Sequence, residues 1–108
     1  MNAKEDIRGQ VLHLAETVDY AAGAVVSKTL LNKKTGTLTL FAFDKGQSLS
    51  EHTSPYDATV LALDGEATLT IGGRKVKAAA GEMVIMPADV PHDVQAEQRF
   101  KMLLIMIR

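Results

Sequence analysis

The chain has 108 residues, 46% of them hydrophobic, which suffices for one domain around a single buried core. Its twelve Lys and Arg residues nearly balance its thirteen Asp and Glu residues and are scattered along the chain, which argues against nucleic acid or an anionic membrane surface as a partner. The absence of cysteine excludes disulfides, thiolate metal sites and cysteine nucleophiles.

The first part of the chain gives a weak structural signal. Residues 1–10 are polar, and we expect them to be frayed. They lack the apolar core of a signal peptide, and the longest apolar run, residues 102–107, is too short to span a bilayer, so we expect a cytoplasmic protein. Residues 11–24 have partly helical spacing, but Gly9 argues against a long helix, so a short strand and a helical turn both fit.

From residue 25 onward the pattern is typical of β-strands, because short segments rich in β-branched and aromatic residues alternate with turn residues. The Asp64-Gly65 and Gly72-Gly73 pairs tolerate positive φ, and we predict that they close two successive hairpins. The sequence therefore predicts an all-β fold, a sandwich or closed barrel, in a single domain over residues 1–108. The expected strands cover residues 25–32, 37–44, 59–64, 67–71, 75–79, 82–87, 92–97 and 100–107.

Two of these strands, at residues 41–43 and 102–107, are apolar on both faces. One face fills the core, and the other needs a cover. A homodimer partner is the simplest cover, although the N-terminal segment can serve instead. Arg74, Lys75 and Lys77 follow the Gly-Gly turn, and we expect them to form a solvated face that discourages edge pairing.

Two segments carry histidines at regular distances from glycines. In the first segment, Gly46 is followed by five residues and then His52, and Gly65 closes the segment. In the second, GEMVIMPADVPHDVQA, Gly81 is followed by Pro87 and His92.

These segments resemble the two motifs of the cupin family, which read G, five residues, H-x-H, three or four residues, E, six residues, G, and then G, five residues, P-x-G, two residues, H, three residues, N. Ser54 stands at the second histidine and Ala58 at the glutamate. Asp89 replaces a glycine, which is physically reasonable because Asp enters left-handed backbone conformations readily, and Ala96 replaces the asparagine. The resemblance implies an antiparallel double-stranded β-helix, or jelly-roll barrel, of about eight to ten strands.

The resemblance also implies that inward-facing motif residues hold a divalent metal such as Zn, Mn, Fe or Ni, with His52 and His92 as ligands here. Such sites usually have at least three protein ligands, so the set is incomplete. Asp57 is the candidate third ligand, but strand alternation turns it outward unless a bulge near Pro55 shifts the register. The remaining histidine, His13, lies in a segment that the sequence does not place.

Three functional hypotheses follow, and the sequence does not decide whether the protein is an enzyme. The favoured one is a metal-free barrel pocket that binds a small molecule. The second is a metal-dependent oxygenase, isomerase or decarboxylase with His52 and His92 as ligands. The third is a non-catalytic structural or sensor module. The other strand methionines, Met83, Met102 and Met106, are assigned to packing. The predicted pocket residues are His52, Ser54, Ala58, Met86 and His92.

Overall fold

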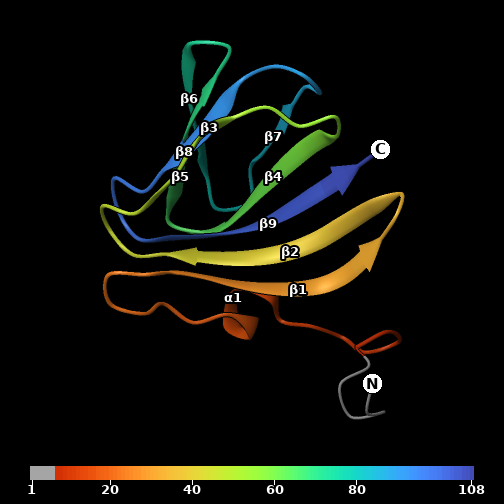
Figure 1. The fold of residues 1–108 in the computed structure, drawn as a ribbon. Helices are drawn as coiled ribbons and strands as arrows, with labels where there is room; N and C mark the ends of the chain where they lie inside the picture. Colours follow the sequence, from red (N-terminus) through yellow and green to blue (C-terminus); the bar gives the residue numbers. More distant parts are fainter. Residues whose placement is uncertain (1–6) are drawn as a thin grey trace.

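The computed structural model describes residues 7–108, which form two antiparallel sheets facing each other across a core (Figure 1). This confirms the all-β barrel, and the nine strands within the described residues agree with the predicted eight to ten. The five-stranded sheet has the order β1 (Val25–Lys33), β2 (Gly36–Phe43), β9 (Phe100–Ile107), β4 (Asp57–Asp64) and β7 (Met83–Met86). The four-stranded sheet has the order β3 (Ser48–His52), β8 (His92–Gln95), β5 (Glu66–Ile71) and β6 (Arg74–Ala79).

Strand β3 is absent from the strands predicted by the sequence pattern. Its sequence, SLSEH, is mostly polar and exposed, so it gives little hydrophobic alternation. The backbone fixes its start, because the Gly46 N–H donates to Ala96 O (2.8 Å) and the Ala96 N–H donates to Gln47 O (2.9 Å). The strand then pairs with β8 and ends at His52.

One of the two predicted hairpins is wrong. The Gly72-Gly73 turn does join paired strands, β5 and β6, with Ile71 opposite Arg74. At Asp64-Gly65, however, the chain leaves the five-stranded sheet for the four-stranded sheet, so β4 and β5 are not paired. Gly65 has φ 68°, and a Cβ there would lie 2.2 Å from Arg99 O, so this crossing requires glycine.

The main core lies between the two sheets. The Phe43 and Phe100 rings stack with centroids 4.5 Å apart, and both side chains are fully buried. Each such ring contributes about 1.5–3 kcal/mol through its burial. Leu69 and Val94 of the four-stranded sheet pack into the same cluster. The core therefore holds the two sheets at a fixed separation, and the cavity described below lies between them.

The outer face of the five-stranded sheet is covered in part by the N-terminal segment (Figure 1). Residues 11–24 contain the one-turn helix α1 (Leu14–Thr17), which agrees with the helical alternative for this segment. Leu14 and Val18 pack with the buried Leu40 and Leu103. The Lys101 ammonium donates to Ala15 O, which ties α1 to β9. The N-terminal segment, one of the two covers that the sequence suggested, therefore covers part of this face.

A hydrogen bond also fastens this segment to the sheet. The Tyr20 hydroxyl donates to Asp64 Oδ2 at 2.6 Å, while Arg99 and Lys101 lie over the Tyr20 ring. Burial and the Asp64 carboxylate raise the pKa of Tyr20.

Of the segment predicted to be frayed, residues 1–6 lie outside the described residues and residues 7–10 form a turn. The helix found within residues 7–108 is too short to cross a bilayer.

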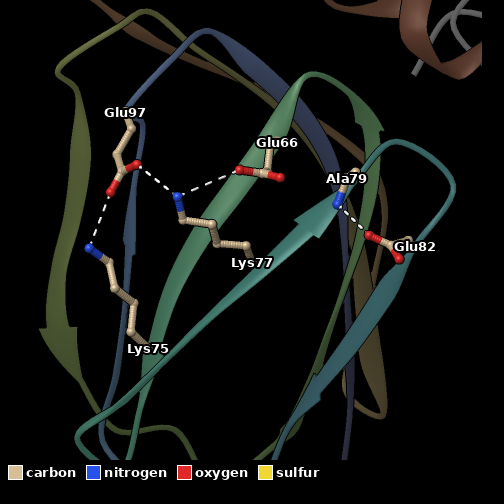
Figure 2. Close-up of polar contacts among 6 residues, drawn as sticks. All are labelled: Glu66, Lys75, Lys77, Ala79, Glu82 and Glu97. Atoms are coloured by element: carbon tan, nitrogen blue, oxygen red, sulfur yellow. Dashed lines mark hydrogen bonds and ion pairs between the residues drawn. The ribbon is translucent and has the colours of Figure 1, made fainter.

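Strand β6, at the edge of the four-stranded sheet, carries the expected solvated charges (Figure 2). Lys75 and Lys77 each lie 3.2 Å from a Glu97 carboxylate oxygen, and Lys77 lies 3.8 Å from Glu66. The two lysines lower the pKa of Glu97, and Glu97 in turn raises the pKa of Lys77. Because these side chains are half-exposed, the network discourages strand addition more than it stabilises the fold.

Candidate functional site

A small cavity lies inside the barrel, between the two sheets. Its volume is about 30 Å³, enough for about two water-sized groups. Apart from two imidazoles the walls are apolar, so a bound group would meet few polar partners. The lining residues are Leu49 and His52 of β3, Ala58 of β4, Met86 of β7, His92 and Val94 of β8, and Met102, Leu104 and Met106 of β9.

The two imidazoles stand directly opposite each other. His52, the last residue of β3, pairs in register with His92, the first residue of β8. Their ring centroids are 4.5 Å apart, in an edge-to-face arrangement. His92 is buried, with 3% of its surface exposed, whereas His52 is exposed. His52 therefore lies on the solvent side of the pair and His92 on the buried side.

The hydrogen bonds of the two rings assign their tautomers. His52 Nδ1–H donates to Ser50 O at 2.7 Å, and His92 Nδ1–H donates to Val90 O at 3.0 Å. A carbonyl oxygen can only accept, so Nδ1 must carry the proton in both rings. In the neutral rings each Nε2 therefore keeps its lone pair, and neither Nε2 has a partner among residues 7–108. The site offers two unused acceptor atoms.

Two loops are bound to each other beside the histidines. The Asp89 N–H donates to Ser54 O at 2.8 Å, and the Ala88 N–H donates to Asp57 Oδ1 at 2.9 Å. Asp89 has φ 64°, the only positive φ of a non-glycine residue in the described part of the chain, which confirms that Asp takes the place of the expected glycine. The β3–β4 and β7–β8 loops thus fix the positions at which β3 ends and β8 begins.

The structure brings together four of the five predicted pocket residues, namely His52, Ala58, Met86 and His92. Ser54 does not line the cavity. Strand β3 ends at His52, so the alternation that would turn Ser54 inward is lost, and the Ser54 Oγ accepts a hydrogen bond from the Tyr56 N–H at 3.0 Å. The Ser54 hydroxyl therefore forms a hydrogen bond with the backbone of its own loop.

The additional candidates for a metal ligand lie elsewhere. Asp57 is exposed, and its carboxylate accepts the Ala88 N–H, because the neighbouring Ala58 takes the inward position of β4. The register shift between β3 and β8 lies between Leu49 and His52, before the first histidine, and not near Pro55, where it would have been needed to turn Asp57 inward. His13 precedes α1 and does not line the cavity.

The donor set does not fit a divalent metal bound by three or more hard ligands. Within residues 7–108, no three His, Cys, Asp or Glu side chains lie close enough to share a metal ion. The cavity contains two imidazoles and no carboxylate. A divalent ion there would keep its full charge in apolar surroundings, which is costly.

Sequence reasoning missed several lining residues. Met102 and Met106 were assigned to packing alone, and Leu49, Val94 and Leu104 were not singled out. The alternation of β9 gave a usable signal, since Met102, Leu104 and Met106 lie two residues apart and share its inner face.

A larger surface hollow of about 270 Å³, beside the β1–β2 turn, contains no histidine and has Lys33 as its charged residue. We therefore place the candidate site at the histidine pair.

The comparison with protein families and the comparison with solved structures indicate the same family. The model of the cupin domain matches residues 39–108. Of the solved structures, a conserved protein of unknown function from Streptococcus pyogenes, SPY1581, is 36% identical, with a TM-score of 0.88 over 93% of this chain and 88% of that one. A cupin 2 conserved barrel domain protein from Leptotrichia buccalis is 43% identical, with a TM-score of 0.88 over 90% of this chain and 47% of that one.

A cupin superfamily protein from Desulfitobacterium hafniense is 30% identical, with a TM-score of 0.86 over 93% of this chain and 92% of that one. A comparison with curated proteins gave no match.

Proposed function

Since the chain belongs to the cupin family, we propose that it uses its barrel as a binding pocket for a small molecule, held by His52 and His92. The observation that carries this proposal is that two histidines line an otherwise apolar cavity while each keeps an Nε2 acceptor without a partner among residues 7–108. A few polar groups in an otherwise apolar concavity are typical of small-molecule sites.

The cavity supports a definite ligand chemistry. Two acceptors and no charged group favour a ligand that donates a hydrogen bond, such as an alcohol, a phenol or a protonated weak acid. The ligand's other end should be small and apolar, because Leu49, Val94 and Leu104 line the remaining wall. At about 30 Å³ the cavity admits only part of such a molecule. Met86, Met102 and Met106 can enlarge it by changing rotamers, because methionine is unbranched and flexible.

The proposal is tested by NMR titration of the protein, with methyl-labelled methionine, against small alcohols, phenols and carboxylic acids. Ligands should shift the methyl signals of Met86, Met102 and Met106. His52→Ala should weaken binding by about tenfold, the equivalent of one lost hydrogen bond, without unfolding the protein, because His52 is exposed. His13→Ala is the matched control and should change nothing. A shift of Met106 without Met86 or Met102 would place the ligand in the Lys33 hollow, which Met106 also lines, and would contradict the proposal, as would equal effects of the two substitutions.

We also propose that a second copy of the chain covers the rest of the outer face of the five-stranded sheet. Leu38, Ile105, Thr59 and Ile85 lie in register across β2, β9, β4 and β7, forming a row on that face. Ile85 is 56% exposed and Met83 of the same strand is 60% exposed. Two such faces can cover each other around a two-fold axis, because the same surface meets itself.

Sedimentation equilibrium should give the mass of two chains, and Ile85→Lys should shift the protein to monomers, because it places a charge in the apolar contact. Arg74→Glu also changes charge, but on β6 of the other sheet, and should leave the mass unchanged. A monomeric wild-type protein would refute this assembly.

A further inference from the structure

The Lys33 hollow, the surface hollow of about 270 Å³ beside the β1–β2 turn, results from one missing side chain. Lys33 of β1, Gly36 of β2 and Ile107 of β9 lie in register across the three strands. Gly36 places no side chain between the other two, so a gap opens there. A Cβ at Gly36 would collide with Met106 O, so no other residue can fill the gap without displacing β9.

The wall of the hollow is aliphatic. The next row, two residues along each strand, consists of Leu31, Leu38 and Ile105, and all three side chains are half-buried. Residues two apart in a strand share a face, so this row borders the gap at Gly36 on the outer face of the sheet. Ile107, 60% exposed, borders it on the β9 side. Within residues 7–108 no aromatic side chain lines the hollow, so a flat ring would find no stacking partner there.

The hollow also carries one cation. Lys33 is exposed, and its ammonium has no hydrogen-bond or ion-pair partner among residues 7–108. Lys75 and Lys77 differ in this respect, because both are paired with Glu97. No Asp or Glu from the described part of the chain lines the hollow. The hollow therefore combines an aliphatic surface with a single available positive charge.

We propose that the Lys33 hollow binds an unbranched aliphatic monocarboxylate, with its chain against Leu31, Leu38 and Ile105 and its carboxylate at the Lys33 ammonium. An exposed ion pair contributes little by itself, so burial of the chain provides most of the affinity and the lysine selects the sign of the ligand's charge. The volume lies close to the lower limit of about 300 Å³ for pockets of small ligands. The inference does not rest on the proposed function of the histidine cavity.

A second copy of the chain is the competing occupant, because Leu38 and Ile105 also belong to the row that it is proposed to cover. The hollow lies on the β1 side of the sheet, whereas Ile85 lies on β7 at the opposite edge. Ile85→Lys, the substitution expected to give monomers, should therefore bind octanoate with the same affinity as the wild type. Binding by this variant alone would assign the hollow to the second copy and overturn the proposal.

The test is a titration of the full chain, with methyl-labelled isoleucine, leucine and methionine, against octanoate and octylammonium at about pH 7, where both probes are charged. Octanoate should shift the NMR signals of Leu38, Ile105 and Ile107, and leave those of Met86 and Met102 in the histidine cavity unchanged. Octylammonium has the same chain and should bind about fivefold more weakly, the upper range for an exposed ion pair. An absence of these shifts with octanoate, or equal affinity for the two probes, would overturn the proposal.

A charge reversal tests the role of the lysine. Lys33→Glu alters an exposed side chain, so the fold should persist, and octylammonium should become the tighter ligand of the two. Lys28→Glu makes the same change at an exposed position of β1 that does not line the hollow, and is the matched control. It should keep the preference for octanoate. An unchanged preference in Lys33→Glu, or an equal change in Lys28→Glu, would refute recognition by Lys33.

The result is distinguishable from the test of the histidine cavity. Octanoate binding at Ile105 and Ile107, in a protein whose Met86 and Met102 respond to none of the alcohols, phenols or acids, would support the Lys33 hollow and reject the histidine pocket. The opposite result would reject the Lys33 hollow alone.

Discussion

Gly65→Ala should leave the protein largely unfolded, with a loss of about 3 kcal/mol or more in the free energy of unfolding. Gly65 is the point at which the chain passes from the five-stranded to the four-stranded sheet, and its φ of 68° is costly for a residue with a side chain. An added Cβ would also lie 2.2 Å from Arg99 O and 3.1 Å from Phe100 Cα, both of them backbone atoms. Neither neighbour can turn aside, so β4 or β9 must shift.

Gly73→Ala is the matched control. Gly73 has a comparable φ of 82°, but a Cβ there meets nothing within 4 Å, so this variant should lose only the backbone term of about 1–2 kcal/mol. Urea denaturation followed by circular dichroism measures both variants. Equal losses would show that the close approach to Arg99 contributes nothing, and that this account of the sheet crossing is wrong.

Ala58→Glu should destabilise the metal-free protein by about 2–4 kcal/mol, because it adds volume and a carboxyl group to a packed interior. Ala58 is 1% exposed and faces the histidine pair from the five-stranded sheet. The new carboxylate would stand where the cupin motif has its glutamate, and would complete a set of three donors with His52 and His92. Zn²⁺ should then restore stability, by about 2.7 kcal/mol at a hundred times its dissociation constant.

Ala58→Gln separates the two effects, because it has nearly the same shape without the charge. It should be destabilised to a similar degree and gain little from Zn²⁺. Thermal unfolding of the wild type and both variants, with and without Zn²⁺, gives the comparison. Equal stabilisation of the two variants, or of the wild type, would show that the missing carboxylate is not what excludes divalent metals.

The sequence predicts the fold well where the signal is local. Segments rich in β-branched and aromatic residues, bounded by turn residues, located eight of the nine strands in the described residues, and the Gly72-Gly73 turn was recognised. Asp64-Gly65 was misread because a left-handed glycine looks the same in a hairpin and in a crossing between sheets. Only the pairing of β4 with β7 and β9, which are distant in sequence, distinguishes the two.

The candidate site was predictable to the extent that the two cupin motifs marked its positions. Four of the residues named from the sequence, His52, Ala58, Met86 and His92, lie in or at the ends of strands and line the cavity. Ser54 was misplaced because the extended pattern does not show that β3 stops at His52. The tautomers of the two rings could not be predicted from the sequence either, because they depend on which backbone carbonyl oxygen lies next to each Nδ1 in the folded chain.

That Met86, Met102 and Met106 line the same cavity as the two histidines could not be predicted, because it depends on sheet order. Met86 and Met106 are neighbours of Ala58 only because β7 and β9 flank β4. The pattern alone gives each methionine an apolar strand position, for which packing is the ordinary explanation.

The most direct test of the histidine pair is a long-range ¹⁵N NMR spectrum of the imidazole nitrogens, recorded above the pH at which the rings are protonated. Both His52 and His92 should carry the proton on Nδ1 and show an unprotonated Nε2, as the bonds to Ser50 O and Val90 O require. His13 provides an internal comparison outside the cavity. A proton on Nε2 of either cavity histidine would remove one of the two acceptors and contradict the account of the site.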